Sequence, residues 1–121
     1  MNWIFVCKKS ELPAGGRKVV LVGGREVGVF REGDDFFAWD NACPHAGGPV
    51  CQGKIIKRVE EVIAADKTGH GFRFSESETH VVCPWHGYEF NIRTGCHQGS
   101  SSVRLRGREV KLEGDDVYLV L

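Results

Sequence analysis

Two short segments of this chain combine the side chains that bind transition metals. Cys43-Pro44-His45 places a cysteine two residues before a histidine, and Cys83-Pro84-Trp85-His86 places a second cysteine three residues before a second histidine. Each segment therefore offers one soft thiolate and one imidazole, a donor set that suits zinc or an iron–sulfur cluster. If the two segments face each other, the four side chains form one site: Cys43, His45, Cys83 and His86.

The residues around these ligands favour an iron–sulfur cluster over zinc. Structural zinc sites usually pair cysteine with cysteine and histidine with histidine, whereas here each segment is mixed. Gly47 and Gly87 follow the histidines and let backbone N–H groups point at sulfide ions, which need hydrogen bonds. Trp85 can shield a cluster from water. A zinc-stabilised interaction module without a redox role is the alternative from another functional class.

The two segments resemble the cluster-binding loops of Rieske proteins. The strings CPHAGGP (43–49) and CPWHGYEFNIRTG (83–95) are similar to both loops of that family, and the ending 114–119 is similar as well. The resemblance implies one [2Fe–2S] cluster per chain, in which two cysteines bind one iron and two histidines bind the other. It also implies a surrounding shell of four further residues: Gly47, Trp85, Gly87 and Tyr88.

The loops differ from those of the cytochrome-complex branch of the family. That branch has an additional cysteine in each loop, joined as a disulfide, and these positions are Gly48 and Trp85 here. Its serine after the second His-Gly is Tyr88, which removes a hydroxyl donor to sulfide. Both differences remove stabilisation of the reduced state. We therefore expect a potential at the low end of the Rieske range, which spans about −150 to +300 mV.

An all-β scaffold is predicted by the short apolar runs outside the loops. Lys18–Val22 and Glu26–Phe30 flank Gly23-Gly24, and this pattern predicts a hairpin because both glycines can take a positive φ. Strands at this spacing favour an antiparallel sandwich or barrel. The remaining strands are expected at Phe36–Asp40, Glu109–Leu112 and Val117–Leu121, with a turn at Gly114-Asp115.

One Rieske domain is expected over residues 1–121, with an antiparallel base and a smaller cluster-binding part at about 41–99. Between His45 and Cys83 lie 37 residues, more than small Rieske ferredoxins usually have. The extra segment, about 57–79, is rich in charge. Despite some helix-like spacing, we expect a hairpin there with the arms Val62–Ala65 and Phe72–Phe74. It is either a solvated face or a surface for a partner.

The remaining cysteines and histidines receive structural interpretations. Five cysteines are an odd number, which fits a reducing compartment and metal binding better than a disulfide framework. Cys7 is expected in the core, and Cys51 and Cys96 as thiols beside the loops. We expect three further histidines at surface or hairpin positions: His70, His80 and His97.

Overall composition excludes several classes of function. Lys plus Arg and Asp plus Glu both number 16, and this zero net charge argues against nucleic-acid binding. No run approaches the roughly 18 apolar residues needed to span a bilayer. The first residues lack the pattern of an export signal, so the expected compartment is the cytoplasm, or an organelle interior if a leader has been removed.

Electron transfer is the function that the resemblance implies. Protein and sulfide fill every iron position, so the domain is expected to carry single electrons and not to be an enzyme itself. The implied partners are redox proteins: a flavoprotein reductase and a terminal enzyme such as an oxygenase. The alternative is a small subunit of a larger redox enzyme, similar to the nitrite reductase small subunit.

Overall fold

The computed structural model describes the chain apart from residues 1–2, 45–46, 64–68, 86, 100–101 and 121, and for residues 57–63 and 69–77 it describes the backbone alone. Within the described residues the strands form two antiparallel sheets, and the helices are single 3₁₀ turns at Lys9–Glu11 (η1) and Val50–Gln52 (η2). No described helix is long and apolar enough to cross a membrane. The all-β class expected from the sequence is confirmed.

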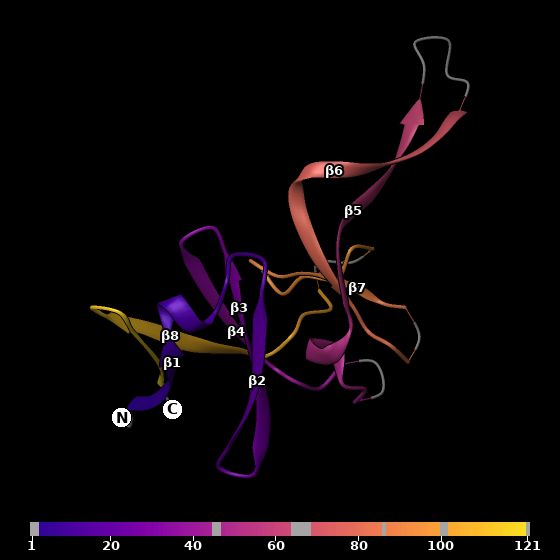
Figure 1. The fold of residues 1–121 in the computed structure, drawn as a ribbon. Coiled ribbons are helices and arrows are strands. Elements are labelled where there is room, and N and C mark those ends of the chain that lie inside the picture. Colours follow the sequence, from indigo (N-terminus) through magenta and orange to yellow (C-terminus); the bar gives the residue numbers. More distant parts are fainter. Residues whose placement is uncertain (1–2, 45–46, 64–68, 86, 100–101, 121) are drawn as a thin grey trace.

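The larger sheet has six strands in the order β1-β9-β8-β4-β3-β2 and curls into a nearly closed barrel (Figure 1). The two chain ends lie close together on this barrel (Figure 1). Its strands are β1 (Trp3–Lys8), β2 (Arg17–Val22), β3 (Arg25–Glu32), β4 (Asp35–Asp40), β8 (Gly107–Glu113) and β9 (Asp116–Val120).

Both predicted hairpins of the barrel are present. β2 pairs with β3 from Arg17↔Phe30 to Val22↔Arg25, and the turn glycines Gly23 and Gly24 have φ of +56° and +80°. Two-residue turns between strands need these left-handed conformations, which glycine adopts without steric cost. β8 pairs with β9 in the same manner, around the predicted turn at 114–115. The strand expected at Phe36–Asp40 is β4, which begins one residue earlier.

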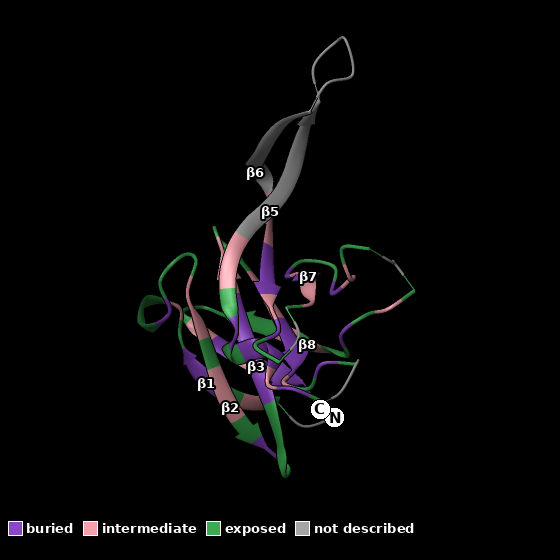
Figure 2. Cartoon of the chain, turned by 90° about the vertical axis from the view of Figure 1, so that its right-hand side faces the viewer, coloured by how far each residue is buried: buried purple, intermediate pink, exposed green. Residues whose placement is uncertain are grey.

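Side chains on both faces of β3 and β4 are buried. Successive residues of a strand point to opposite faces, so Val27, Val29 and Ala38 pack inside the barrel while Phe30 and Trp39 pack on its other side. Burying a side chain of this size contributes about 1.5–3 kcal/mol. The buried stretches gather around β3 at the centre of the body (Figure 2). These two strands therefore connect the barrel core to the part that carries the loops.

The smaller sheet, in the order β5-β6-β7, consists of β5 (Lys54–Ile63), β6 (Gly69–Val82) and β7 (Glu89–Asn91). β5 and β6 extend from the body as a long arm (Figure 1). The hairpin predicted for this segment is present, but its strands are much longer than the two predicted arms. The end of the first predicted arm, Ala65, and most of the predicted turn lie outside the described residues.

Irregular pairing explains why the sequence underestimates this arm. The register of β5 against β6 shifts between Lys57 and Val59 and again between Glu61 and Ile63. Each shift breaks the alternation of apolar and polar residues by which a strand is recognised. The apolar residues of β5 therefore have the helix-like spacing noted above, although the backbone is extended. The assignment of one domain over residues 1–121 stays a prediction.

Candidate metal centre

The first ligand loop is closed by two backbone hydrogen bonds. The Cys43 N–H donates to the Gly48 carbonyl at 2.8 Å, and the Gly47 N–H donates back to the Cys43 carbonyl at 2.7 Å. Gly47 has a φ of +75°, a conformation that other residues rarely adopt, and this allows the chain to reverse so tightly. The loop leaves β4 at Asp40 and leads into η2, so the barrel holds one end of it.

Although its histidine is one position later, the second loop repeats this frame. The Cys83 N–H donates to the Tyr88 carbonyl at 2.8 Å, and the Gly87 N–H donates to the Cys83 carbonyl at 2.9 Å. Gly87 has a φ of +72°. This loop joins β6 to β7, which are themselves paired from His80↔Asn91 to Val82↔Glu89. Two loops with equivalent closing hydrogen bonds and equivalent glycines thus present one cysteine each.

The two loops are in contact where the cysteines are buried. Cys43 is 4% exposed and Cys83 is 2% exposed. A Cβ at Gly48 would lie 3.0 Å from the Cys83 Sγ, so the backbone of the first loop packs directly on the thiol of the second. His45 and His86 lie outside the described residues, and the four-ligand set therefore remains a prediction. Among the described side chains, no group of three or more potential ligands is close enough to hold a metal ion.

This arrangement fits a sulfur-bound metal group. Neither cysteine forms a disulfide, and both come from loops that approach each other without an intervening side chain at Gly48. A buried thiolate is costly unless a cation or metal compensates its charge. Two soft donors in a buried setting therefore match the cysteine side of an iron–sulfur cluster.

Trp85 covers the contact between the loops and stays largely exposed. A Cβ at Gly48 would lie 2.8 Å from Cδ2 of the Trp85 ring, so the indole rests on the first loop. The ring is nevertheless 57% exposed and presents its outer side to solvent. The indole packs on the first loop with one side, and the shielding of a cluster by Trp85 stays a prediction.

The structure describes the contacts of Gly47, Gly87 and Tyr88, while their place in a shell around the cluster stays a prediction. The N–H groups of Gly47 and Gly87 bond to the carbonyls of Cys43 and Cys83, so these two glycines shape the loops, and the donation of other loop N–H groups to sulfide stays a prediction. Tyr88 is half-buried, packs against the core that includes Cys43 and Cys83, and has its ring 5.0 Å from that of His97. His97 is itself half-buried and not simply a surface residue.

His80 is the position that sequence reasoning placed least well. It lies on β6, so the hairpin interpretation holds, but it is 2% exposed and the surface interpretation is wrong. Its Nδ1 hydrogen-bonds with Glu89 Oε1 at 3.1 Å, and its Nε2 lies 3.6 Å from Glu78 Oε2. β7 covers this end of β6, and that burial follows from strand pairing over a distance that local sequence does not reveal. The side chain of His70 is outside the described residues.

The three cysteines outside the loops are thiols, as expected. Cys7 is buried in β1, Cys96 is half-buried, and neither forms a disulfide. Cys51 packs so closely on Gly28 that a Cβ there would lie 2.6 Å from its Sγ. Burial raises the pKa of the Cys51 thiol to about 12. It stays protonated at neutral pH.

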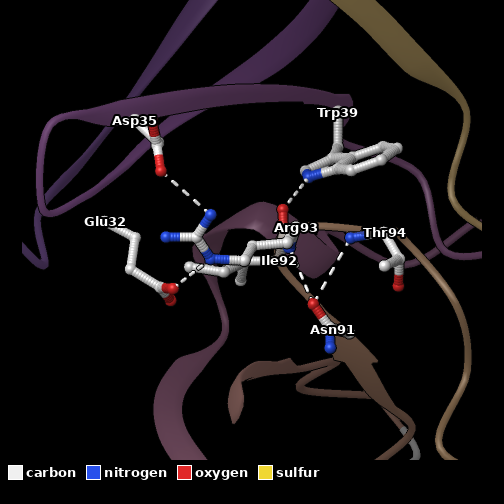
Figure 3. A network of polar contacts seen from close by, with 7 residues as sticks. All are labelled: Glu32, Asp35, Trp39, Asn91, Ile92, Arg93 and Thr94. Carbon is white, nitrogen blue, oxygen red and sulfur yellow. Dashed lines mark hydrogen bonds and ion pairs between the residues drawn. The ribbon is translucent and has the colours of Figure 1, made fainter. Parts of the chain in front are cut away.

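A polar network fixes the loop-bearing part to the barrel (Figure 3). The Arg93 guanidinium donates to Glu32 of β3, and its Nη1 lies 3.0 Å from Asp35 Oδ2 of β4. The Asn91 side-chain oxygen accepts from the N–H of Arg93 at 2.8 Å and from that of Thr94 at 3.3 Å. The turn after β7 is thus bound to β3 and β4, the two barrel strands whose side chains pack into both hydrophobic cores.

Trp39 makes the buried half of the same junction. Its indole Nε1–H donates to the Ile92 carbonyl at 2.7 Å (Figure 3). A Cβ at Gly95, where φ is +74°, would lie 2.6 Å from the Trp39 ring, and one at Gly107 would lie 3.0 Å from it. The large ring therefore fits only because two neighbouring backbones lack side chains.

An antiparallel barrel that carries two contacting cysteine loops defines a small metal-binding protein of the iron–sulfur class. The family model of the Rieske [2Fe–2S] domain matches residues 2–111. The chain belongs to the Rieske family, and it binds one [2Fe–2S] cluster. The resemblance seen in the loops is confirmed.

Known relatives support this assignment along the whole chain. Ferredoxin CarAc of Metapseudomonas resinovorans is 29% identical over 119 residues, which are 97% of this chain and 92% of the relative. A chain in the solved complex of reduced oxygenase and oxidised ferredoxin in carbazole 1,9a-dioxygenase is 26% identical, with a TM-score of 0.70 and coverage of 98% and 92%. A solved structure from Mycobacterium tuberculosis, described as a putative NADH-dependent nitrite reductase small subunit, has a TM-score of 0.71 at 18% identity, covering 98% and 93%.

Proposed function

We propose that this chain is a cytoplasmic carrier of single electrons, which receives them from a flavoprotein reductase and passes them to a terminal oxygenase. Its proposed ligands are Cys43, His45, Cys83 and His86. The observation that carries the proposal is the pair of equivalent loops, each with a buried cysteine, in contact at Gly48. The absence of disulfides among the five cysteines supports a reducing compartment.

The bound cluster supplies one-electron chemistry between its oxidised and reduced states. The chain holds both cysteines in closed, hydrogen-bonded loops, so their positions change little when charge is added. Burial of these cysteines excludes water from their side of the site. The exposed face of Trp85 lies beside the loop contact, and we assign the docking of redox partners to this surface.

The oxygenase is favoured over nitrite reductase as the partner. Similarity to ferredoxins of oxygenase systems extends over nearly the whole chain, with 29% identity to CarAc. A structural relative in this group comes from a complex with an oxygenase. The nitrite reductase small subunit shares the fold at 18% identity, and a shared fold does not by itself transfer function.

Electron paramagnetic resonance of anaerobically purified protein, with iron and sulfide assays, tests the proposal. We expect a signal that appears only on reduction with dithionite, with the low average g of a histidine-ligated cluster, and two irons per chain. Cys43→Ser should abolish this signal, whereas Cys96→Ser, outside the loops, should retain it. A colourless protein with one zinc would instead establish the interaction module.

A charge-adding variant tests the histidine ligands, which the structure does not describe. His86→Cys should retain a cluster if it folds, but an added thiolate brings negative charge and should lower the potential toward that of plant-type ferredoxins, about −400 mV. His97→Cys, outside the proposed ligand set, is the matched control and should leave the potential unchanged. An unchanged potential in a loaded His86→Cys protein would contradict the proposed ligation.

A further inference from the structure

An open pocket of about 510 Å³ lies on the barrel where β3 and β8 begin. Its volume is in the range of small-molecule sites. Val22 and Val27 are buried and form an apolar floor, and Gly23 and Gly107 leave space because they have no side chains. The remaining lining residues are all arginines: Arg25, Arg106 and Arg108.

One buried carboxylate organises two of these arginines. Arg108 makes a bidentate pair with Asp40, with Nε to Oδ1 at 2.8 Å and Nη2 to Oδ2 at 3.0 Å. Arg25 Nη1 lies 3.8 Å from the same Asp40 Oδ2. The neighbouring carboxylate, Glu26, accepts a hydrogen bond from the Asn41 amide instead. Two guanidinium groups therefore share one carboxylate, and one positive charge of this trio remains uncompensated.

Arg106 contributes a guanidinium that the described part of the chain leaves uncompensated. Its backbone carbonyl accepts a hydrogen bond from the Asp40 N–H at 2.8 Å, which fixes its place at the pocket. The residue is exposed, and no described residue forms an ion pair with its side chain. Guanidinium groups bind carboxylate and phosphate through paired N–H donors, and an apolar floor strengthens such contacts.

We propose that this pocket binds a small dianion, either a phosphate group or a pair of carboxylates. Arg106 and Arg25 supply the N–H donors, while Arg108, fixed by Asp40, supplies a positioned positive charge. The inference is independent of the cluster and of its redox partners. It also accounts for a concentration of arginine that the zero net charge of the chain conceals.

Amide NMR titration of the oxidised holoprotein tests this site with two probes, inorganic phosphate and succinate, at ionic strength matched with chloride. We expect saturable shifts of the Gly23 and Gly107 amides, none with chloride, and none at Gly114, which occupies the acidic turn between β8 and β9. Saturation by phosphate alone would identify a phosphate site. Saturation by succinate alone or by both probes would identify a carboxylate or a general dianion site.

Two matched variants make the test specific. Arg106→Gln removes one pocket charge without touching Asp40 and should weaken binding at least about tenfold, since hydrogen bonds to charged groups are strong. Arg104→Gln removes the same charge two residues away, where the guanidinium donates to the Thr94 carbonyl, and should leave the affinity within about twofold. No saturable shift with either probe, or equal weakening by both variants, would overturn the proposal.

Discussion

Gly48 is the residue on which the contact between the two ligand loops depends. Any side chain there would meet both Trp85 and the Cys83 sulfur, at 2.8 and 3.0 Å from its Cβ. Real Cβ atoms rarely come so close to other heavy atoms, so one of the two loops has to move. The spacing of the cysteines and histidines gave no indication of this requirement.

Gly48→Ala should therefore disturb the cluster without unfolding the barrel. We expect a shifted potential and a partial loss of iron, because the Cys83 sulfur is displaced. Potentiometry with iron analysis measures both. Gly99→Ala is the matched control, since its Cβ would meet only the His97 ring at 3.3 Å. Equal potentials and iron contents in the two variants would show that the loop contact is not needed.

The buried thiol of Cys51 predicts a pH dependence of stability. Burial raises its pKa from 9.0 to about 12, so the folded state holds this proton more tightly than the unfolded state does. The stabilisation is complete below about pH 9 and is lost as pH rises toward 12. Urea unfolding across this pH range should show that the free energy of unfolding falls by roughly a few kcal/mol, and that it falls less in Cys51→Ala. Parallel declines in both proteins would contradict this.

At the residue scale, chemistry is easier to predict than burial. The family was predicted correctly because the type and spacing of the proposed ligands and the glycines beside them point to one kind of site. His80 was misplaced because its burial depends on Glu89 and β7, which approach only after the chain has passed through the second loop. Nothing in the residues beside His80 encodes that contact.

Among the elements, the junction of Trp39 with the turn after β7 holds the two sheets together. Trp39→Phe removes the indole donor and leaves the Ile92 carbonyl buried without its partner, which costs about 1–3 kcal/mol. Chemical unfolding should show this loss of stability in Trp39→Phe. Trp3→Phe changes an exposed tryptophan and should show no such loss. We expect a smaller effect from Arg93→Gln, because that ion pair is largely solvated. Equal stabilities of the two tryptophan variants would show that the hydrogen bond of Trp39 does not contribute to the stability of the fold.

The arm of β5 and β6 is expected to be dispensable for cluster binding. The pairs Lys54↔Val82, Ile55↔Val81 and Ile56↔His80 lie at its base, and only this base is continuous with the loops. A two-stranded ribbon is marginally stable by itself, so it adds little to the body. Replacing residues 57–79 by a short turn should leave the reduced EPR signal unchanged. Loss of the cluster in a folded variant would show that the arm supports the loops.

The hairpins of the barrel were predictable and the extent of this arm was not. The turn between β2 and β3 needs two positive φ values, and the pair Gly23-Gly24 makes this requirement visible in the sequence. The register shifts near Val59 and Ile63 are compensated by pairing across the ribbon, so the sequence of either strand alone does not reveal them. The type of each element could therefore be predicted from the sequence, whereas the length of β5 and β6 could not, because it depends on the pairing of the two strands.

At the scale of the whole molecule, average properties conceal local ones. The chain has no net charge, yet three arginines line one pocket of the barrel, and only two of them pair with the carboxylate of Asp40. Family membership was evident from the loops, because they repeat a pattern that few other sites require. The way the barrel is joined to the loops was not evident, because it depends on residues as distant in sequence as Glu32 and Arg93.

The three tryptophans of this chain report on different parts of its structure through their fluorescence. Trp39 is buried between the sheets. Trp3 and Trp85 are exposed, Trp3 on the edge strand β1 of the barrel and Trp85 at the contact between the loops. Indole emission shifts to longer wavelength in water, so a chain retaining only Trp39 would emit in the blue while its sheets stay joined. Trp85, beside an absorbing cluster, would be quenched when iron is bound. Fluorescence thus separates opening of the junction from loss of the cofactor.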